Sequence, residues 1–145
     1  DIKNRTTTSY THKNCEKDTW YKYRITAYRI IGKKKTAISK SLELHSLTKG
    51  SKTYENPSRV KIRSGKKFSL KAGSTKKIRA QVIVPKGKKT CWHIQKIRYL
   101  VSDSSILTVS KKGKIRAKKA GHATIYAVAQ NGVNAKIKVS VIAAK

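Results

Sequence analysis

One short stretch combines an aromatic ring with basic side chains, and it is the clearest candidate for ligand chemistry. Lys88, Lys89, Trp92 and His93 lie within six consecutive positions. An indole ring beside ammonium groups can stack on a sugar or a base while the lysines contact its anionic substituents. The alternative is structural: such a tryptophan more often packs over the open end of the surrounding fold. These four residues are the candidate ligand contacts.

The types and spacing of the other polar residues predict neither catalysis nor a metal site. Asp103 is the only acidic residue after Glu55, so this part of the chain lacks the carboxylate pair of glycoside hydrolysis. No serine lies in a strand–elbow–helix motif, and His122 follows a turn glycine, where we expect it at the surface. The four histidines are scattered and no Cys-x-x-Cys occurs. We expect no enzymatic activity, no metal and no cofactor.

The two cysteines, Cys15 and Cys91, lie in different segments of the chain. A disulfide between them would require the two segments to touch at those points. Two partly buried thiols are the alternative, and the sequence leaves both open.

The chain carries a formal net charge of +30, from 36 Lys and Arg against 6 Asp and Glu. The excess is concentrated after residue 48, where 25 basic residues face 2 acidic ones. Such a field attracts polyanions and is screened by salt. No run of apolar residues reaches the length of a membrane-spanning helix, so we expect no membrane insertion. The sequence begins at Asp1 and has no Met, which predicts a piece of a longer protein.

Most of these basic residues alternate with apolar ones, which places them on the solvated faces of strands. The residues in question are Lys76, Lys77, Arg79, Lys96, Arg98, Lys114, Arg116, Lys118, Lys136 and Lys138. Lysines at exposed strand edges also prevent aggregation. Nucleic-acid readers add arginine clusters, stacking platforms or a recognition helix. The pattern therefore predicts weak, salt-dependent polyanion binding without sequence preference.

The stretch 97–129 predicts a series of short antiparallel strands. Apolar residues alternate with polar ones through 97–101, 107–109, 115–117 and 123–129, which is the period of a strand. Gly113 sits in a Lys-Lys-Gly-Lys hairpin and can adopt a positive φ, while Gly121 follows Ala120 in another turn. Earlier strands are expected near Val60 to Ile62, Phe68 to Leu70 and Ile78 to Val84.

These motifs closely resemble the bacterial immunoglobulin-like domain, group 2. The resemblance rests on Ser102-Asp103, Leu107-Thr108-Val109, Ile115-Arg116-Ala117, Gly121-His122-Ala123-Thr124-Ile125, Asn131-Gly132 and the last strand, 135–141. Many members carry Trp in the central strand where this chain has Tyr99, which keeps a large aromatic in the core. The resemblance implies an all-β fold, an immunoglobulin-like Greek-key β-sandwich over 58–145.

The first segment, 1–48, resembles the last part of a fibronectin type III domain. The run 19–28 reads as one strand, followed by a hairpin at Ile31-Gly32-Lys33-Lys34 and a returning strand from Thr36 to Leu44. The resemblance makes Tyr21 a tyrosine-corner residue, whose phenol bonds to nearby backbone. Residues 1–48 supply only the last strands of such a sandwich, so this is a partial module. Residues 49–57 are polar, contain Gly50 and end at Pro57, and read as a linker.

Together the two resemblances imply a non-catalytic spacer and adhesion element of a larger bacterial cell-surface or secreted protein. Lysine-rich versions of such modules are common in secreted proteins of Gram-positive gut bacteria, and the expected partner is a cell-wall or host-surface glycan or protein. One alternative is a module that binds polyanions such as teichoic acid or sulfated glycan. Another is an accessory module of a secreted glycan- or peptidoglycan-cleaving enzyme.

The partial module leaves an apolar strand face without its second layer. Residues 19–44 contain Tyr23, Ile25 and Ala27 on one predicted face, and three strands leave unpaired edges. We expect self-association through 19–44, with a second copy supplying the missing layer; the neighbouring domain or a retained N-terminal fragment are the alternatives.

Overall fold

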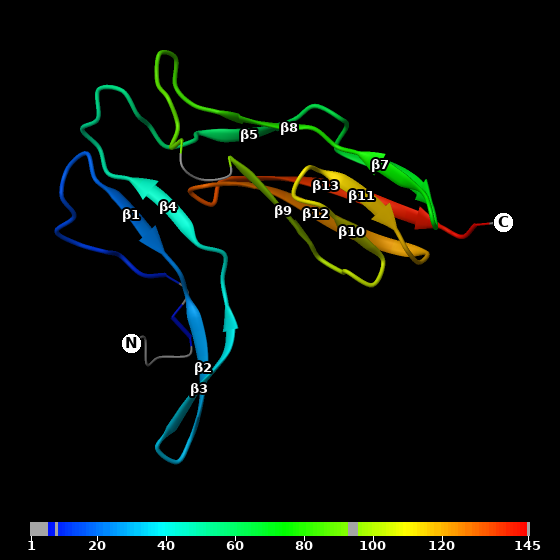
Figure 1. Ribbon diagram of the computed structural model, residues 1–145, viewed down its shortest axis with the longest axis horizontal. Helices are drawn as coiled ribbons and strands as arrows, with labels where there is room; N and C mark the ends of the chain where they lie inside the picture. Colours follow the sequence, from blue (N-terminus) through cyan, green and yellow to red (C-terminus); the bar gives the residue numbers. More distant parts are fainter. Residues whose placement is uncertain (1–5, 8, 93–95, 145) are drawn as a thin grey trace.

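The computed structural model describes residues 6–7, 9–92 and 96–144. In this part of the chain the regular elements are all β-strands, joined by turns and loops (Figure 1). The strands are β1 (Trp20–Tyr23), β2 (Thr26–Ile31), β3 (Lys34–Lys40), β4 (Leu44–Leu47), β5 (Arg59–Ile62), β6 (Lys67–Lys71), β7 (Thr75–Lys77), β8 (Ala80–Ile83), β9 (Ile97–Val101), β10 (Leu107–Val109), β11 (Lys114–Ala117), β12 (Gly121–Ala129) and β13 (Asn134–Ile142). The all-β prediction is confirmed. The described residues contain no helix with the length and apolarity that a membrane crossing requires.

Strands β5 to β13 build a two-layer sandwich. One layer is a four-stranded sheet in the order β6-β13-β12-β9, in which β6 runs parallel to β13 and the other neighbours are antiparallel. The other layer contains the β10-β11-β7 sheet and the β5-β8 pair. Figure 1 shows β10 and β11 crossing over β12 and β13. The strands predicted for 97–129 are confirmed as β9 to β12.

A bend at Ile78 and Arg79 lets one stretch of chain serve both parts of the second layer. Before the bend, β7 pairs with β11; after it, β8 pairs with β5. The Ile78 N–H donates to the Gly113 carbonyl at 2.9 Å, and the Arg63 N–H donates to the Arg79 carbonyl at 2.8 Å. The strand predicted from Ile78 to Val84 is found as β8 (Ala80–Ile83), which begins after the bend, and β7, which ends before it, was not predicted.

The core lies between the two layers and follows the alternation of the sequence. Its fully buried members are Ile78, Leu107, Ile115, Ala117, Ile125, Ile137 and Val139. Burying each leucine, isoleucine or valine side chain contributes about 1.5–3 kcal/mol. A second, smaller group of buried residues contains Val60, Ala127 and Ala129. Tyr99 is half-buried and packs against both groups, and this burial raises the pKa of its phenol.

Gly113 has no room for a side chain. Its φ is +78°, and an added Cβ would lie 2.7 Å from the Ile78 carbonyl oxygen and 3.3 Å from the Tyr99 ring. Any other residue would therefore displace backbone and strain its own conformation. Gly121, at φ +149°, is less constrained, because its added Cβ would meet the flexible end of Ile106 at 2.8 Å.

Strands β1 to β4 form a bent two-stranded ribbon, here called the N-terminal ribbon. β1 pairs with β4, and β2 pairs with β3 as the predicted hairpin around Gly32. The continuous strands expected at 19–28 and from Thr36 to Leu44 are wrong, because the ribbon is interrupted at Arg24-Ile25 and at 41–43. At this bend the Ser41 hydroxyl accepts the Ile25 N–H at 2.9 Å. A side chain thus replaces one rung of the backbone ladder.

Candidate functional site

Trp92 lies in the long connection between β8 and β9, and its side chain is 79% exposed. The expectation that it packs over the end of the sandwich is therefore wrong. The connection opens with a turn at Pro85, whose carbonyl accepts the Lys88 N–H at 3.1 Å, and Gly87 takes a φ of +78°. After this turn the chain runs beside residues 53–55, so the tryptophan follows a segment that is held in place on one side.

An open groove of about 730 Å³ lies beside Trp92, here called the Trp92 groove. One wall comes from β8 and the residue after it, and the other from the connection and the start of β9. The described residues that line the groove are Tyr54, Ala80, Gln81, Val82, Val84, Lys88, Lys89, Thr90, Trp92, Lys96 and Ile97. None of them is acidic, so the groove presents aromatic and apolar surface framed by ammonium groups.

The predicted contacts have different roles within this groove. The Lys88 ammonium donates to the carbonyls of Ser51 at 2.9 Å and Lys52 at 2.8 Å, so it fastens the connection to residues 49–57. Lys89 pairs through its backbone, donating to Thr53 and accepting from Glu55 at 2.9 Å each, while its side chain stays exposed. The structure thus brings Trp92, Lys88 and Lys89 together, and His93 lies outside the described residues.

The groove's chemistry is that of binding. An exposed indole face stacks on sugar rings, and the lysines contribute positive charge at its rim. The described residues contain no cluster of histidine, cysteine and acidic side chains that could hold a metal ion. His122 contacts Ser140, with 2.9 Å between Nδ1 and Oγ, but no described hydrogen bond joins that imidazole to a carboxylate. A serine nucleophile needs a base that is itself oriented by a third group, and the described hydrogen bonds give His122 no such partner.

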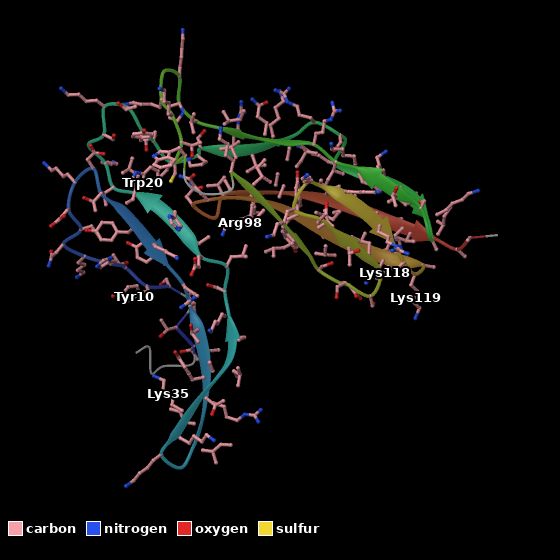
Figure 2. The ribbon with its side chains drawn as sticks, viewed as in Figure 1. Tyr10, Trp20, Lys35, Arg98, Lys118 and Lys119 are labelled. Carbon is pink, nitrogen blue, oxygen red and sulfur yellow. The ribbon has the colours of Figure 1, made fainter. Side chains whose placement is uncertain are left out.

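Arg98 occupies the junction between the N-terminal ribbon and the sandwich (Figure 2). Its guanidinium donates to the Glu43 carbonyl just before β4, and on the sandwich side to the carbonyls of Ala129 at 3.2 Å and Gln130 at 3.4 Å. Burial lowers the pKa of this guanidinium, with a smaller opposing effect from Glu43. The expectation that Arg98 lies on a solvated strand face is wrong.

The turn after β12 completes this junction. The His45 N–H donates to the Gln130 carbonyl at 2.9 Å, and the Asn131 side-chain amide donates to the Pro57 carbonyl at 2.9 Å. Gln130 is fully buried and its amide oxygen accepts the Thr90 hydroxyl at 2.7 Å. Gly132, at φ +92°, packs so closely that an added Cβ would lie 3.3 Å from Leu44.

Residues 49–57, expected as a linker, contact both parts of the chain. The Asn56 side chain accepts the Leu47 N–H at 2.8 Å and donates to the Leu47 carbonyl at 2.6 Å. Tyr54 forms an isolated bridge with Lys89, and its ring meets Trp20 edge-on with 6.4 Å between the centroids. The ribbon, this segment and the sandwich are therefore tied by backbone hydrogen bonds as well as side chains.

No disulfide joins the two cysteines, both of which the structure describes. Cys15 is partly exposed and its thiol lies 3.6 Å from the His12 carbonyl oxygen, whereas Cys91 is buried beside the Trp92 groove. Tyr21, the predicted tyrosine-corner residue, accepts the Glu16 N–H at its hydroxyl at 3.0 Å. The phenol thus bonds to backbone five positions upstream.

The sandwich has two packed layers. One contains the β5–β8 pair and the other has β6 running parallel to β13, an arrangement that defines an immunoglobulin-like β-sandwich. Residues 60–140, more than half of the chain, match the family of bacterial Ig-like domains, group 2. The chain belongs to this family, as the sequence motifs predicted. It is a non-catalytic domain family, commonly found as surface or extracellular modules of larger proteins. No curated protein matches the chain.

Proposed function

We propose that this chain is a non-catalytic spacer and adhesion element of a larger bacterial extracellular protein. The observation that carries the proposal is the junction at Arg98. A spacer must hold its neighbours at a fixed orientation, and carbonyls from both parts of the chain converge on one guanidinium there. The expected partner is a cell-wall or host-surface glycan or protein, and the chain itself has no hydrolase activity.

We further infer that residues 1–48 are the closing strands of a fibronectin type III module. The bond from the Glu16 N–H to the Tyr21 hydroxyl supports this, because a tyrosine corner in such sandwiches fixes a phenol against backbone a few residues upstream. The bent ribbon with a hairpin at Gly32 fits the last strands of such a module. An array of two different sandwich domains is a natural architecture for a spacer.

The junction is tested by nitrogen-15 relaxation on the whole chain. The expected result is one rotational correlation time for residues 20–47 and 59–142. Arg98→Ala leaves the carbonyls of Glu43, Ala129 and Gln130 without their charged donor, so the two parts should move more freely and their correlation times should diverge. Arg116→Ala is the matched control, because Arg116 is exposed on β11 and the same charge is lost. Independent tumbling in the unmodified chain, or in both variants equally, would contradict the proposal.

A second candidate role is glycan binding in the Trp92 groove. The specific observation is the exposed indole above a groove of about 730 Å³ that lacks acidic residues among its described lining. Teichoic acid and sulfated glycan are the candidate ligands, and the role also fits an accessory module of a secreted glycan- or peptidoglycan-cleaving enzyme.

Trp92 fluorescence tests the groove directly. In a Trp20→Phe background Trp92 is the only indole, and a sulfated glycosaminoglycan should change its emission saturably. Because stacking on an aromatic residue is worth about 1–3 kcal/mol, Trp92→Ala should weaken binding roughly tenfold and Trp92→Tyr much less. Equal affinity of Trp92→Ala and the parent, measured by calorimetry, would rule the groove out.

A further inference from the structure

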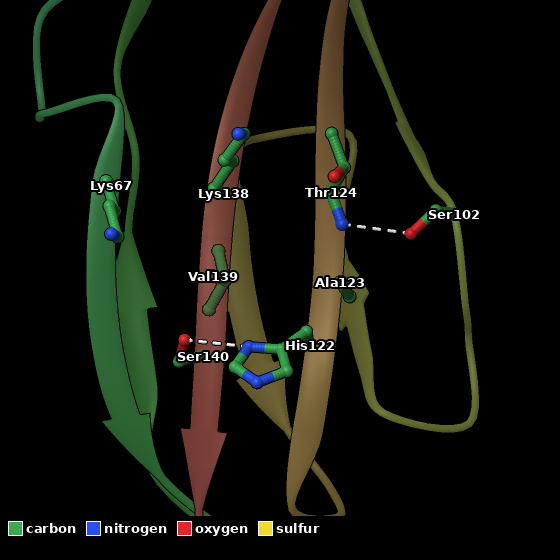
Figure 3. Close-up of a pocket in the computed structure, with 8 residues that line it drawn as sticks. All are labelled: Lys67, Ser102, His122, Ala123, Thr124, Lys138, Val139 and Ser140. Carbon is green, nitrogen blue, oxygen red and sulfur yellow. Dashed lines mark hydrogen bonds between the residues drawn. The ribbon is translucent and has the colours of Figure 1, made fainter.

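A second depression, which shares no lining residue with the Trp92 groove, lies on the outer face of the four-stranded sheet (Figure 3). It has a volume of about 350 Å³ and is here called the sheet-face hollow. Its lining residues are Lys67, Ser102, His122, Ala123, Thr124, Lys138, Val139 and Ser140. They come from β6, β12, β13 and the residue after β9, so paired strands of the four-stranded sheet form the floor of the hollow.

Strand alternation explains why polar groups converge there. Ala123, Val139 and Val141 are buried in the core, so the residues between them face outward. Within the sheet Lys138 is the register partner of both Lys67 and Thr124, and the Ser102 N–H donates to the Thr124 carbonyl at 2.9 Å. Two residue pairs further along, on the same face of the sheet, His122 lies opposite Ser140.

The positive charge in the hollow lacks a compensating carboxylate. Lys67 and Lys138 lie side by side on neighbouring strands, and like charges in that position destabilise a sheet. Both ion pairs among the described residues belong to Glu43 of the N-terminal ribbon. Asp103, the only acidic residue after Glu55, accepts the Ser105 N–H at 2.8 Å and the Ser105 hydroxyl at 2.6 Å. An anion in the hollow would relieve the repulsion between the two ammonium groups.

The neutral groups of the hollow add directional hydrogen bonds. The Ser102 hydroxyl accepts the Thr124 N–H at 2.9 Å, which leaves its own hydrogen to donate. The Nδ1 atom of His122 lies 2.9 Å from the Ser140 hydroxyl oxygen, which fixes both side chains (Figure 3). Tetrahedral oxyanions bind where ammonium and hydroxyl donors meet without a competing carboxylate.

We propose that the sheet-face hollow binds the sulfate or phosphate group of an anionic polymer. At about 350 Å³ it lies near the lower end of the range for small-molecule sites, which suits one such group and part of the attached sugar or polyol. This role is independent of the spacer and groove proposals. It differs from general attraction to the net charge of +30, because it predicts one saturable location.

The test compares two variants that lose equal charge from equivalent positions. Lys67→Gln/Lys138→Gln removes the opposed pair in the hollow. Lys77→Gln/Lys114→Gln removes another directly opposed pair, on the β7–β11 edge, that does not line the hollow. The whole chain is titrated with inorganic phosphate and inorganic sulfate at constant ionic strength, and amide shifts are followed by NMR. Affinities for polyglycerol phosphate and for a sulfated glycosaminoglycan are then measured by calorimetry.

In the parent and the control variant, shifts of residues 102, 122–124 and 138–140 should saturate together. In the hollow variant they should be lost, and its affinity for the preferred polymer should fall about tenfold, against less than about threefold for the control. His122→Gln, which replaces the imidazole beside Ser140 without removing an ammonium group, should weaken binding by an intermediate factor. A preference for polyglycerol phosphate would identify a phosphate polymer as the source, and a preference for the glycosaminoglycan a sulfated one.

Two results would overturn the proposal. The first is an equal loss of affinity in the two double variants, which would show that only overall charge matters. The second is a linear, non-saturating response of residues 122 and 138–140 to both inorganic anions.

Discussion

Arg98 shows how one side chain can fix the arrangement of two parts of a chain. A hydrogen bond from a charged donor to a carbonyl contributes about 1.5–3 kcal/mol, and removing the donor leaves its acceptors unsatisfied. Arg98 donates to acceptors just before β4 and at the end of β12, and its Nε is buried without a hydrogen-bond partner. Lysine lacks the planar, forked set of donors with which Arg98 contacts both sets of carbonyls. The fixed geometry of the planar guanidinium is therefore what the junction requires.

Glu43 gives the N-terminal ribbon a dependence on pH. Its carboxylate accepts the Lys22 ammonium at 2.7 Å and the Arg24 guanidinium at 3.1 Å. The hydrogen bond from Lys22 is the main reason that the pKa of Glu43 is lowered from its ordinary value of 4.5. With the folded pKa below the unfolded one, the stabilisation is complete above pH 4.5 and is lost as the pH falls through the folded pKa.

We predict that the amide shifts of β1 and β4 titrate together with a midpoint below pH 4.5. An NMR titration from about pH 6 to about pH 2 measures it. Glu43→Gln should abolish the transition, whereas Asp103→Asn, remote on the sandwich, should leave it unchanged. A midpoint at or above pH 4.5, or a transition that persists in Glu43→Gln, would show that the ion pairs do not form.

At the scale of elements, the β2–β3 hairpin is the part of the chain without a packing layer. Ile25, Ile30, Ile31 and Ile38 are between 59% and 71% exposed, and the hairpin projects away from the sandwich (Figure 1). The same region, 25–41, carries five basic residues and no acidic one. Apolar surface therefore favours association of two copies, while their charge opposes it.

We predict that self-association through this hairpin strengthens as salt rises. The screening length falls from about 10 Å at 0.1 M salt to about 3 Å at 1 M, which removes the repulsion and leaves the apolar contact. Sedimentation at both salt concentrations measures the dimer fraction. Ile30→Thr/Ile31→Thr should abolish the dimer, while Ile142→Thr, at an exposed position at the end of β13, should not. A monomer at every salt concentration would show that a second copy does not cover the hairpin.

The sequence predicted the strands of the sandwich well and the bends poorly. From β9 to β13 the alternation is regular and Gly113 and Gly121 mark the turns, so the local signal and the tertiary fold agree. The breaks at Arg24-Ile25 and at Ile78-Arg79 have no such signal in the local sequence. At these breaks the Ile25 and Ile78 N–H groups donate to Ser41 and Gly113, which are distant in the sequence. The anchoring of Lys88 beside Trp92 and the partial burial of Arg98 likewise depend on residues 43–57 and 129–131. The lysines of the sheet-face hollow could be assigned to a solvated face, but the hollow itself depends on four strands meeting in register.

At the scale of the whole molecule, a net charge of +30 creates repulsion that the contact between the N-terminal ribbon and the sandwich must overcome. The junction achieves this with backbone hydrogen bonds and the partly buried guanidinium of Arg98, so it does not rely on surface ion pairs, which are worth little and weaken with salt. Lys67, Lys138, Lys89 and Lys96 remain exposed to solvent and to anionic polymers. Exposed positive charge of this kind is compatible with the proposed role as a spacer.

The most direct test of the proposed stiff spacer is a distance distribution across the junction. Spin labels at Lys33→Cys, in the hairpin turn, and Lys112→Cys, in the turn between β10 and β11, would report it by double electron–electron resonance in a Cys15→Ser/Cys91→Ala background. We predict one narrow distribution that is unchanged between low and high salt and that broadens in Arg98→Ala. A broad or bimodal distribution in the chain with Arg98 intact would contradict the account.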